Sequence, residues 1–105
     1  MSRGVLGLLG LGLRAGGLVI GVDGVRRALQ AGQVRCVVVA SDASPRARDK
    51  VVRLAAANGV PLVPGPDAAA IGGGLGRPPV MVAGVRDRAL ADGLCRLARG
   101  TSQEE

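Results

Sequence analysis

No position in this 105-residue chain carries phenylalanine, tyrosine or tryptophan. Hydrophobic residues still make up 48% of the sequence, a share that fits a globular protein and argues against a disordered chain. The core must therefore be built from Val, Leu, Ile, Ala and Met, and such a core favours thin layers of helix on sheet. The length is that of one ordinary domain, so we expect a single core.

Short apolar runs alternate with helix-like stretches along the chain. The run Cys36–Ala40 is continuous and rich in β-branched residues, which is typical of a central strand buried on both faces. The alternation predicts an α/β fold: a three-layer α/β/α sandwich with a mostly parallel central sheet of about four strands. We expect one domain over residues 1–100 and a polar tail over 101–105. The expected strands are Leu18–Ile20, Cys36–Ala40, Pro61–Val63 and Val80–Ala83, and the expected helices are Ser2–Ala15, Val22–Ala31, Pro45–Asn58, Pro66–Ile71 and Arg88–Arg99.

The start of the chain resembles a signal peptide, because Arg3 precedes the apolar run from Gly4 to Leu13. However, Arg14 lies where a cleavage region would be, and no clear A-x-A sequence follows. The run is also too short to span a bilayer. We therefore expect a core helix here, a cytoplasmic protein and no membrane partner.

The formal net charge of +6 and the isoelectric point of about 11.3 indicate a polyanionic partner, because a basic protein attracts phosphates and releases their counterions. The alternative is a solvated basic surface with no such partner. Lys50 is the only lysine, and the bias toward arginine, alanine and glycine resembles the codon usage of a GC-rich genome. The net charge is thus better evidence than the identity of the arginines.

Metal-dependent and nucleophilic chemistry have few candidate residues. The chain has no histidine, and its two cysteines, Cys36 and Cys95, lie far apart without C-x-x-C spacing. We expect buried free thiols in a reducing compartment, with a disulfide as the alternative. The usual base for nucleophilic catalysis is missing, so we expect no enzymatic activity, no metal and no cofactor. Asp42, after the central strand, has an active-site position for an α/β fold, but such a residue more commonly caps the following turn.

Two glycine-rich segments fail as nucleotide-binding motifs. Gly10-Leu11-Gly12 follows no strand, and the next glycine, Gly16, is one residue out of register for G-x-G-x-x-G. The segment from Gly72 to Gly76 has no lysine and no following helix. The first segment predicts close helix packing, and the second predicts a flexible loop.

Three blocks, Arg14–Gly21, Gly21–Leu29 and Val38–Pro45, together resemble the kink-turn-binding ribosomal protein superfamily, in its bacterial YlxQ-type branch. Asn58–Pro61 and Gly76–Pro78 extend the resemblance, which covers most of the chain up to about Val85. The resemblance implies an α/β/α sandwich and a non-catalytic, ribosome-associated or accessory protein. Its implied partner is structured RNA, with ribosomal RNA as one candidate, and we expect no DNA specificity and a monomer.

The resemblance also implies where the RNA binds. Members of the superfamily insert the start of the second helix beside the sheared G·A pairs of a bent RNA, and a later loop covers the flipped-out nucleotide. A helix N-terminus suits phosphate, and an arginine fork suits phosphate or a guanine edge. Carried onto this chain, the helix surface is Gly21, Val22, Asp23, Gly24, Arg26 and Arg27, the neighbouring loop is Ser41, Asp42 and Ala43, and the covering loop is Leu75, Gly76 and Arg77.

The chain departs from the superfamily at the implied site. Typical members have Asn-Glu where this chain has Asp23 and Gly24, and often lysines where it has Val19 and Ile20. These changes predict looser RNA binding or a different RNA, because aspartate can only accept hydrogen bonds. We also expect Asp23 to accept bonds from the first helical turn, and Arg26 to point away from the core. Two alternatives remain: a protein-interaction module that has lost its RNA contacts, and the recognition domain of an RNA 2′-O-methyltransferase, which needs a further catalytic domain.

Overall fold

The computed structural model describes residues 2–103 and, for side chains, residues 4–98. The helices agree with expectation to within a few residues, whereas the last strand begins two residues later than expected and the last helix runs past Arg99. The elements in chain order are α1 Ser2–Arg14, β1 Leu18–Ile20, α2 Val22–Gln30, β2 Cys36–Val39, α3 Pro45–Ala57, β3 Leu62–Pro64, α4 Ala68–Gly74, β4 Val82–Val85 and α5 Arg88–Gln103.

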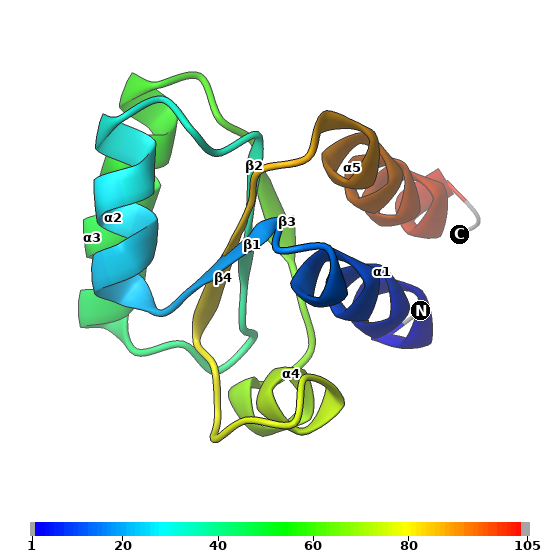
Figure 1. The fold of residues 1–105 in the computed structure, drawn as a ribbon. Helices are drawn as coiled ribbons and strands as arrows, with labels where there is room; N and C mark the ends of the chain where they lie inside the picture. The colour runs from blue at the N-terminus through cyan, green and yellow to red at the C-terminus, as the bar shows by residue number, and fades with distance from the viewer. Residues whose placement is uncertain (1, 104–105) are drawn as a thin grey trace.

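The sheet lies between two layers of helices, as the alternation of elements predicted. Helices α2 and α3 cover one face, and α1 and α5 cover the other (Figure 1). The short helix α4 covers neither face fully but lies at one end of the sheet. The three-layer α/β/α arrangement with four strands is therefore confirmed.

The prediction of a mostly parallel sheet is wrong. The strand order is β1-β4-β2-β3, and only β2 and β3 pair in parallel, whereas β4 is antiparallel to both of its neighbours. The reason lies in α4, whose seven residues rise only about 10 Å and stay at the end of the sheet where β3 stops. Strand β4 therefore starts at that end and must run back against β1 and β2.

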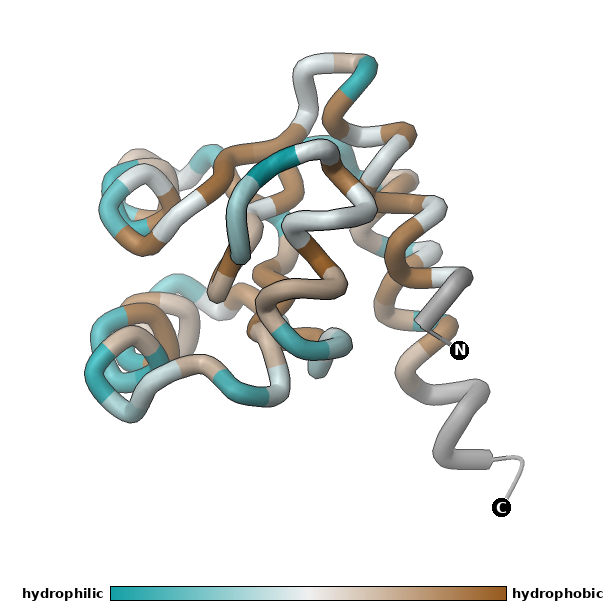
Figure 2. The backbone as a smooth tube through the Cα atoms, turned by 90° about the horizontal axis from the view of Figure 1, so that it is seen from below, coloured by the Kyte–Doolittle hydropathy of each residue, from teal (hydrophilic) through white to brown (hydrophobic). Residues whose placement is uncertain are grey.

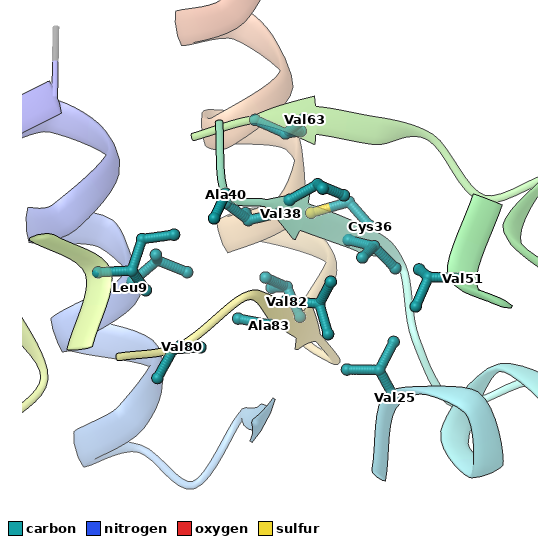
Figure 3. Close-up of a cluster of buried hydrophobic side chains, with 14 of the residues drawn as sticks. Leu9, Val25, Cys36, Val38, Ala40, Val51, Val63, Val80, Val82 and Ala83 are labelled. Carbon is teal, nitrogen blue, oxygen red and sulfur yellow. The ribbon is translucent and has the colours of Figure 1, made fainter. Parts of the chain in front are cut away.

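The core consists of small and branched side chains only. Its fully buried members come from both helical layers and from three strands. Figure 3 shows part of this cluster, with Val38 and Val82 between Leu9 of α1 and Val25 of α2. Strand β2 is buried throughout, as expected for a central strand. Met81 does not contribute to the core as predicted, because it is 39% exposed, and Met1 lies outside the described residues. The largest fully buried side chains are Leu9, Leu29, Ile71, Leu94, Val25, Val37, Val38, Val51, Val63, Val82, Val85 and Cys36.

Both cysteines are free thiols, and they differ in exposure. Cys36 in β2 is fully buried, whereas Cys95 in α5 is only partly buried. Burial, followed by the smaller effects of the nearby Cys95 and Asp92, raises the pKa of Cys36 from 9.0 to about 12. Cys36 is thus a neutral core side chain. Among the described residues no helix is long and apolar enough to cross a membrane.

Candidate nucleic-acid interface

Four loops meet at the end of the sheet where α4 lies, drawn at the bottom of Figure 1. Main-chain hydrogen bonds tie them together: the Gly21 N–H donates to the Val82 carbonyl at 3.0 Å, and the Ala40 N–H donates to the Met81 carbonyl at 2.8 Å. The Ser41 N–H donates to a carbonyl of the β3–α4 loop at 3.0 Å. The three segments implied by the sequence resemblance therefore lie at one end of the molecule. Figure 2 views this end, with α2 and α3 seen end-on at the left.

The N-terminus of α2 is open. Its N-cap is Gly21, with φ 97° and ψ 156°, a backbone conformation that is essentially restricted to glycine. No side chain caps the helix, so the prediction that Asp23 accepts bonds from the first turn is wrong. Asp23 lies exposed within the first turn instead. The first amides of α2 are thus free of side-chain acceptors, which is the arrangement that receives an anion at a helix start.

Gly24 has a packing reason to be glycine. A Cβ atom at this position would lie 3.0 Å from Cγ1 of Val19 in β1, which is tighter than ordinary van der Waals contact. Position 19 is one of the two where typical members of the superfamily carry lysine, and position 24 is where they carry glutamate. The two departures are therefore adjacent in space, and Val19 and Gly24 form one apolar contact.

The two arginines of α2 differ in environment. Arg27 is exposed, whereas Arg26 is only partly exposed, and its Nε atom is buried without a hydrogen-bond partner among the described residues. The prediction that Arg26 points away from the core therefore fails for its Nε atom, whereas Arg27 is exposed. Arg27 is the freer of the two to reach a ligand.

The β2–α3 loop is held by α4. The carboxylate of Asp42 accepts the N–H of Ala68, the first residue of α4, at 2.8 Å, so Asp42 does not cap its own turn as expected. Ser41 is exposed, but Ala43 is buried in the core and offers no side chain to a ligand. Asp42 thus fixes the position of one loop relative to the next element.

The glycine segment before the implied covering loop is helical, so the prediction of a loop over all of residues 72–76 is wrong. Residues 72–74 complete α4, and the helix ends in a Schellman motif in which the Arg77 N–H donates to the Gly72 carbonyl at 2.8 Å. Gly76, with φ 68°, makes the left-handed turn. Leu75 is buried, so the surface of this loop consists of Gly76 and the exposed Arg77.

Sequence reasoning missed two arginines at this end. Arg46 and Arg48 are both exposed in the first turns of α3, whose N-cap Ser44 accepts the Ala47 N–H at 3.1 Å. Arg48 also lines a shallow hollow of about 290 Å³ that includes Ser41. The signal was available, because both arginines directly follow the Val38–Pro45 block on which the resemblance rests.

The comparisons with known proteins decide the family. A model of the ribosomal protein L7Ae/L30e/S12e/Gadd45 family matches residues 4–94, which is most of the chain. The chain belongs to this family. A protein of unknown function from Bacillus halodurans has a similar structure, with a TM-score of 0.86 and 30% identity, over 90% of this chain and 96% of that one.

A more distant structure shows the same fold. The 15.5kD RNA-binding protein of Giardia lamblia aligns with a TM-score of 0.76 and 21% identity, over 97% of this chain and 88% of that one. At 21% identity, this likeness to the Giardia protein shows a shared fold alone. A comparison with curated protein sequences finds no significant match.

Proposed function

We propose that this protein binds structured RNA of the kink-turn type through the end of the fold where α4 lies. The start of α2 enters the RNA groove, and the α4–β4 turn covers a nucleotide beside it. The observation that carries the proposal is the convergence of the uncapped start of α2 and the exposed Arg77 at one end of the sheet, with the exposed Arg27 further along α2, in its last turn. Membership of the L7Ae family supports it.

The proposed contacts divide by chemistry. The free amides of α2 bind a phosphate, and the backbone of Gly21 allows close approach. Arg27 presents its guanidinium fork to a phosphate or to a guanine edge in the groove. Arg77 binds a phosphate of the covered nucleotide, and Arg46 and Arg48 extend the basic surface.

Asp23 and Gly24 set the specificity. Asp23 is exposed in the first turn of α2, where its carboxylate accepts hydrogen bonds from the N1 and N2 groups of a guanine. It cannot donate to an acceptor as an asparagine would, and the contact of a glutamate at position 24 is absent. We therefore propose a looser RNA specificity than that of typical members.

We propose no catalytic step. The one carboxylate in an active-site position, Asp42, is bound to the Ala68 amide and serves the arrangement of the loops. We also propose, from the bacterial YlxQ-type resemblance, that the protein associates with ribosomes in the cytoplasm as a monomer. Sedimentation of ribosomes from cells, with and without ribonuclease treatment, tests this association.

Two substitutions test the RNA site. Arg27→Ala should weaken binding of a labelled kink-turn RNA by about 1–3 kcal/mol if the side chain reads a base edge. Asp23→Asn should tighten binding, because it removes a negative charge beside phosphates and restores a donor. Arg53→Ala is the matched control, since Arg53 is exposed, lies on α3 and pairs with Asp49 at 3.3 Å. Structured RNA should also bind more tightly than duplex DNA of equal length.

The outcome separates RNA binding from the alternative function. If both Asp23→Asn and Arg27→Ala leave the affinity for RNA unchanged while the far-ultraviolet circular dichroism stays native, this face is not the RNA site. The exposed Asp23 and the small Gly24 would then favour a protein-interaction surface on the same fold. Equal affinity for RNA and DNA would reduce the claim to general polyanion binding.

A further inference from the structure

A second group of arginines lies at the opposite end of the sheet, drawn at the top of Figure 1, where β4 ends and α5 begins. It consists of Arg14, Arg35, Arg86 and Arg88, and all four side chains are exposed. We name these four residues the distal arginines. They come from four parts of the chain: the last turn of α1, the entry to β2, the exit of β4 and the start of α5.

Main-chain bonds bring the distal arginines together. The Arg35 N–H donates to the carbonyl of Val85 at 2.7 Å, and Val85 immediately precedes Arg86. The Arg86 N–H donates to the Gly17 carbonyl at 2.9 Å, three residues after Arg14. The residues after α1, the entry to β2 and the segment between β4 and α5 therefore lie side by side at this end of the sheet.

Little negative charge offsets this group. Asp87 is the acidic residue among these segments, and its carboxylate already accepts the Leu90 N–H at 3.2 Å. The ion pair found within the described residues joins Asp49 and Arg53 on α3, away from this end. The distal arginines thus stand without carboxylate partners, and such a concentration of fixed positive charge attracts phosphates.

An apolar hollow lies beside the arginines. It measures about 550 Å³ and lies between the last turns of α1 and the first turn of α5. Leu11 on its wall is 55% exposed, the highest value among the large hydrophobic side chains of the described residues. The hollow is lined by Leu11, Gly12, Ala15, Gly17, Asp87 and Leu90.

We propose that this end is a second RNA contact, for an unpaired segment that flanks the structured element. Phosphates bind the distal arginines, and a splayed base lies in the hollow against Leu11 and Leu90, where guanidinium planes supply the stacking surface that aromatic rings usually provide. A duplex would use the arginines alone, since its bases are paired and stacked inside. The proposal rests on the proposed function only in the choice of RNA as the polyanion.

The two basic ends together give the protein a bivalent surface. The molecule measures 32 × 29 × 28 Å, so an RNA that occupies both ends must run along its side. A structured element at the α4 end fixes the RNA, and the flanking strand then reaches the distal arginines at high effective concentration. The second contact therefore matters most for RNAs with an unpaired extension.

The test compares two double variants of equal charge. Arg35→Ala/Arg86→Ala removes two distal arginines, and the control Arg53→Ala/Arg96→Ala removes two exposed arginines from the helices. The probe is a labelled oligouridylate, titrated at several salt concentrations. We expect the distal variant to lower the slope of log K against log salt by about 1.4, since each lost single-strand phosphate contact contributes about 0.7, and the control to change it much less.

A third variant probes the hollow. Leu11→Gln keeps the charge and a helix-forming residue, and it should weaken binding of the oligouridylate several-fold while leaving binding of a duplex RNA unchanged. Equal salt slopes for the two double variants would overturn the proposal, as would an equal effect of Leu11→Gln on single-stranded and duplex RNA. Native circular dichroism of each variant shows that it is folded.

A further arm separates this proposal from the first. A minimal kink-turn RNA without unpaired extensions should lose affinity with Arg27→Ala and keep it with Arg35→Ala/Arg86→Ala. If the minimal RNA does not bind at all but the oligouridylate results hold, the proposed function fails and the second contact stands. If the minimal RNA loses equal affinity with both variants, the second contact is not distinct and the proposal fails.

Discussion

Gly72 lies against the backbone of the α4–β4 turn, so a substitution at this position tests how that turn is held in place. A Cβ atom at this position would collide with the backbone carbonyl of Pro78, whose carbonyl carbon would be 2.7 Å away, and with the Arg77 oxygen at 2.9 Å. Both neighbours are main-chain atoms, so they can move only if the turn itself moves. The adjacent Gly73 is in the same helix, but a Cβ there meets no atom within 4 Å.

The expected difference in stability between Gly72→Ala and Gly73→Ala follows from two opposing effects. Glycine to alanine within a helix stabilises by up to about 1 kcal/mol, and Gly73→Ala should show this gain. Gly72→Ala has the same helical preference but adds overpacking that costs about 1–3 kcal/mol. We therefore expect Gly72→Ala to be less stable than Gly73→Ala by roughly 1–3 kcal/mol, and to displace Arg77.

Urea denaturation followed by far-ultraviolet circular dichroism measures the difference, because the chain has no tryptophan or tyrosine for fluorescence. Titration of labelled kink-turn RNA reports on the turn: its affinity should fall with Gly72→Ala and hold with Gly73→Ala. Equal free energies of unfolding for the two variants would refute the reasoning, because the helix and the turn would then not be in backbone contact.

Two other predictions concern Asp42 and Cys36. Asp42→Ala leaves the Ala68 N–H without its acceptor and should destabilise the protein by about 1–3 kcal/mol. Asp42→Asn keeps an acceptor oxygen and should cost less. Urea titrations of both variants measure the two losses in stability, and equal losses would contradict the prediction. Burial raises the pKa of Cys36 from 9.0 to about 12, so its contribution to stability is fully present below pH 9 and is lost as the pH rises toward 12. Cys36→Ala should therefore flatten the fall of the urea midpoint above pH 9, and an unchanged pH profile would argue against a buried neutral thiol.

Local chemistry made most of the elements predictable. The run Cys36–Ala40 is so rich in β-branched residues that only a buried strand suits it, and β2 is buried along its whole length. Expected helices lie at every position where the structure has one. The glycines after α1, α2 and α3 mark the ends of these helices, because each has a positive φ.

Features that depend on distant segments were not predictable. Strand direction depends on where α4 lies, and nothing in the sequence of β4 states that it pairs with both β1 and β2. The error at the glycine run has a different origin: residues 72–74 have poor helical preference, but the N–H groups of Gly76 and Arg77 bond to the carbonyls of Gly73 and Gly72 and close the helix there.

The candidate site was also predictable only in part. The resemblance pointed to three segments that the fold does bring to one end, because chain order and loop positions carry over among proteins of one fold. It also included Ala43 and Leu75, which are buried. The helix pattern, for its part, gave Asp23 a capping role that α2 does not use. Exposure and hydrogen bonding depend on side-chain packing, and a pattern of residues does not specify them.

The absence of aromatic rings limits how the proposed RNA ligand can be recognised. Aromatic stacking platforms are unavailable, so phosphates bound by arginines must supply most of the affinity, and that part depends strongly on salt. Discrimination must then come from the hydrogen bonds proposed for Asp23 and from backbone geometry, namely the conformation of Gly21 and the turn at Gly76. On this account the arginines determine how tightly RNA binds, whereas the two glycine turns determine which shape of RNA fits. A substitution at Arg77 should change both the affinity for all RNAs and the salt slope, and a substitution that alters either turn should change the ranking of RNAs by affinity.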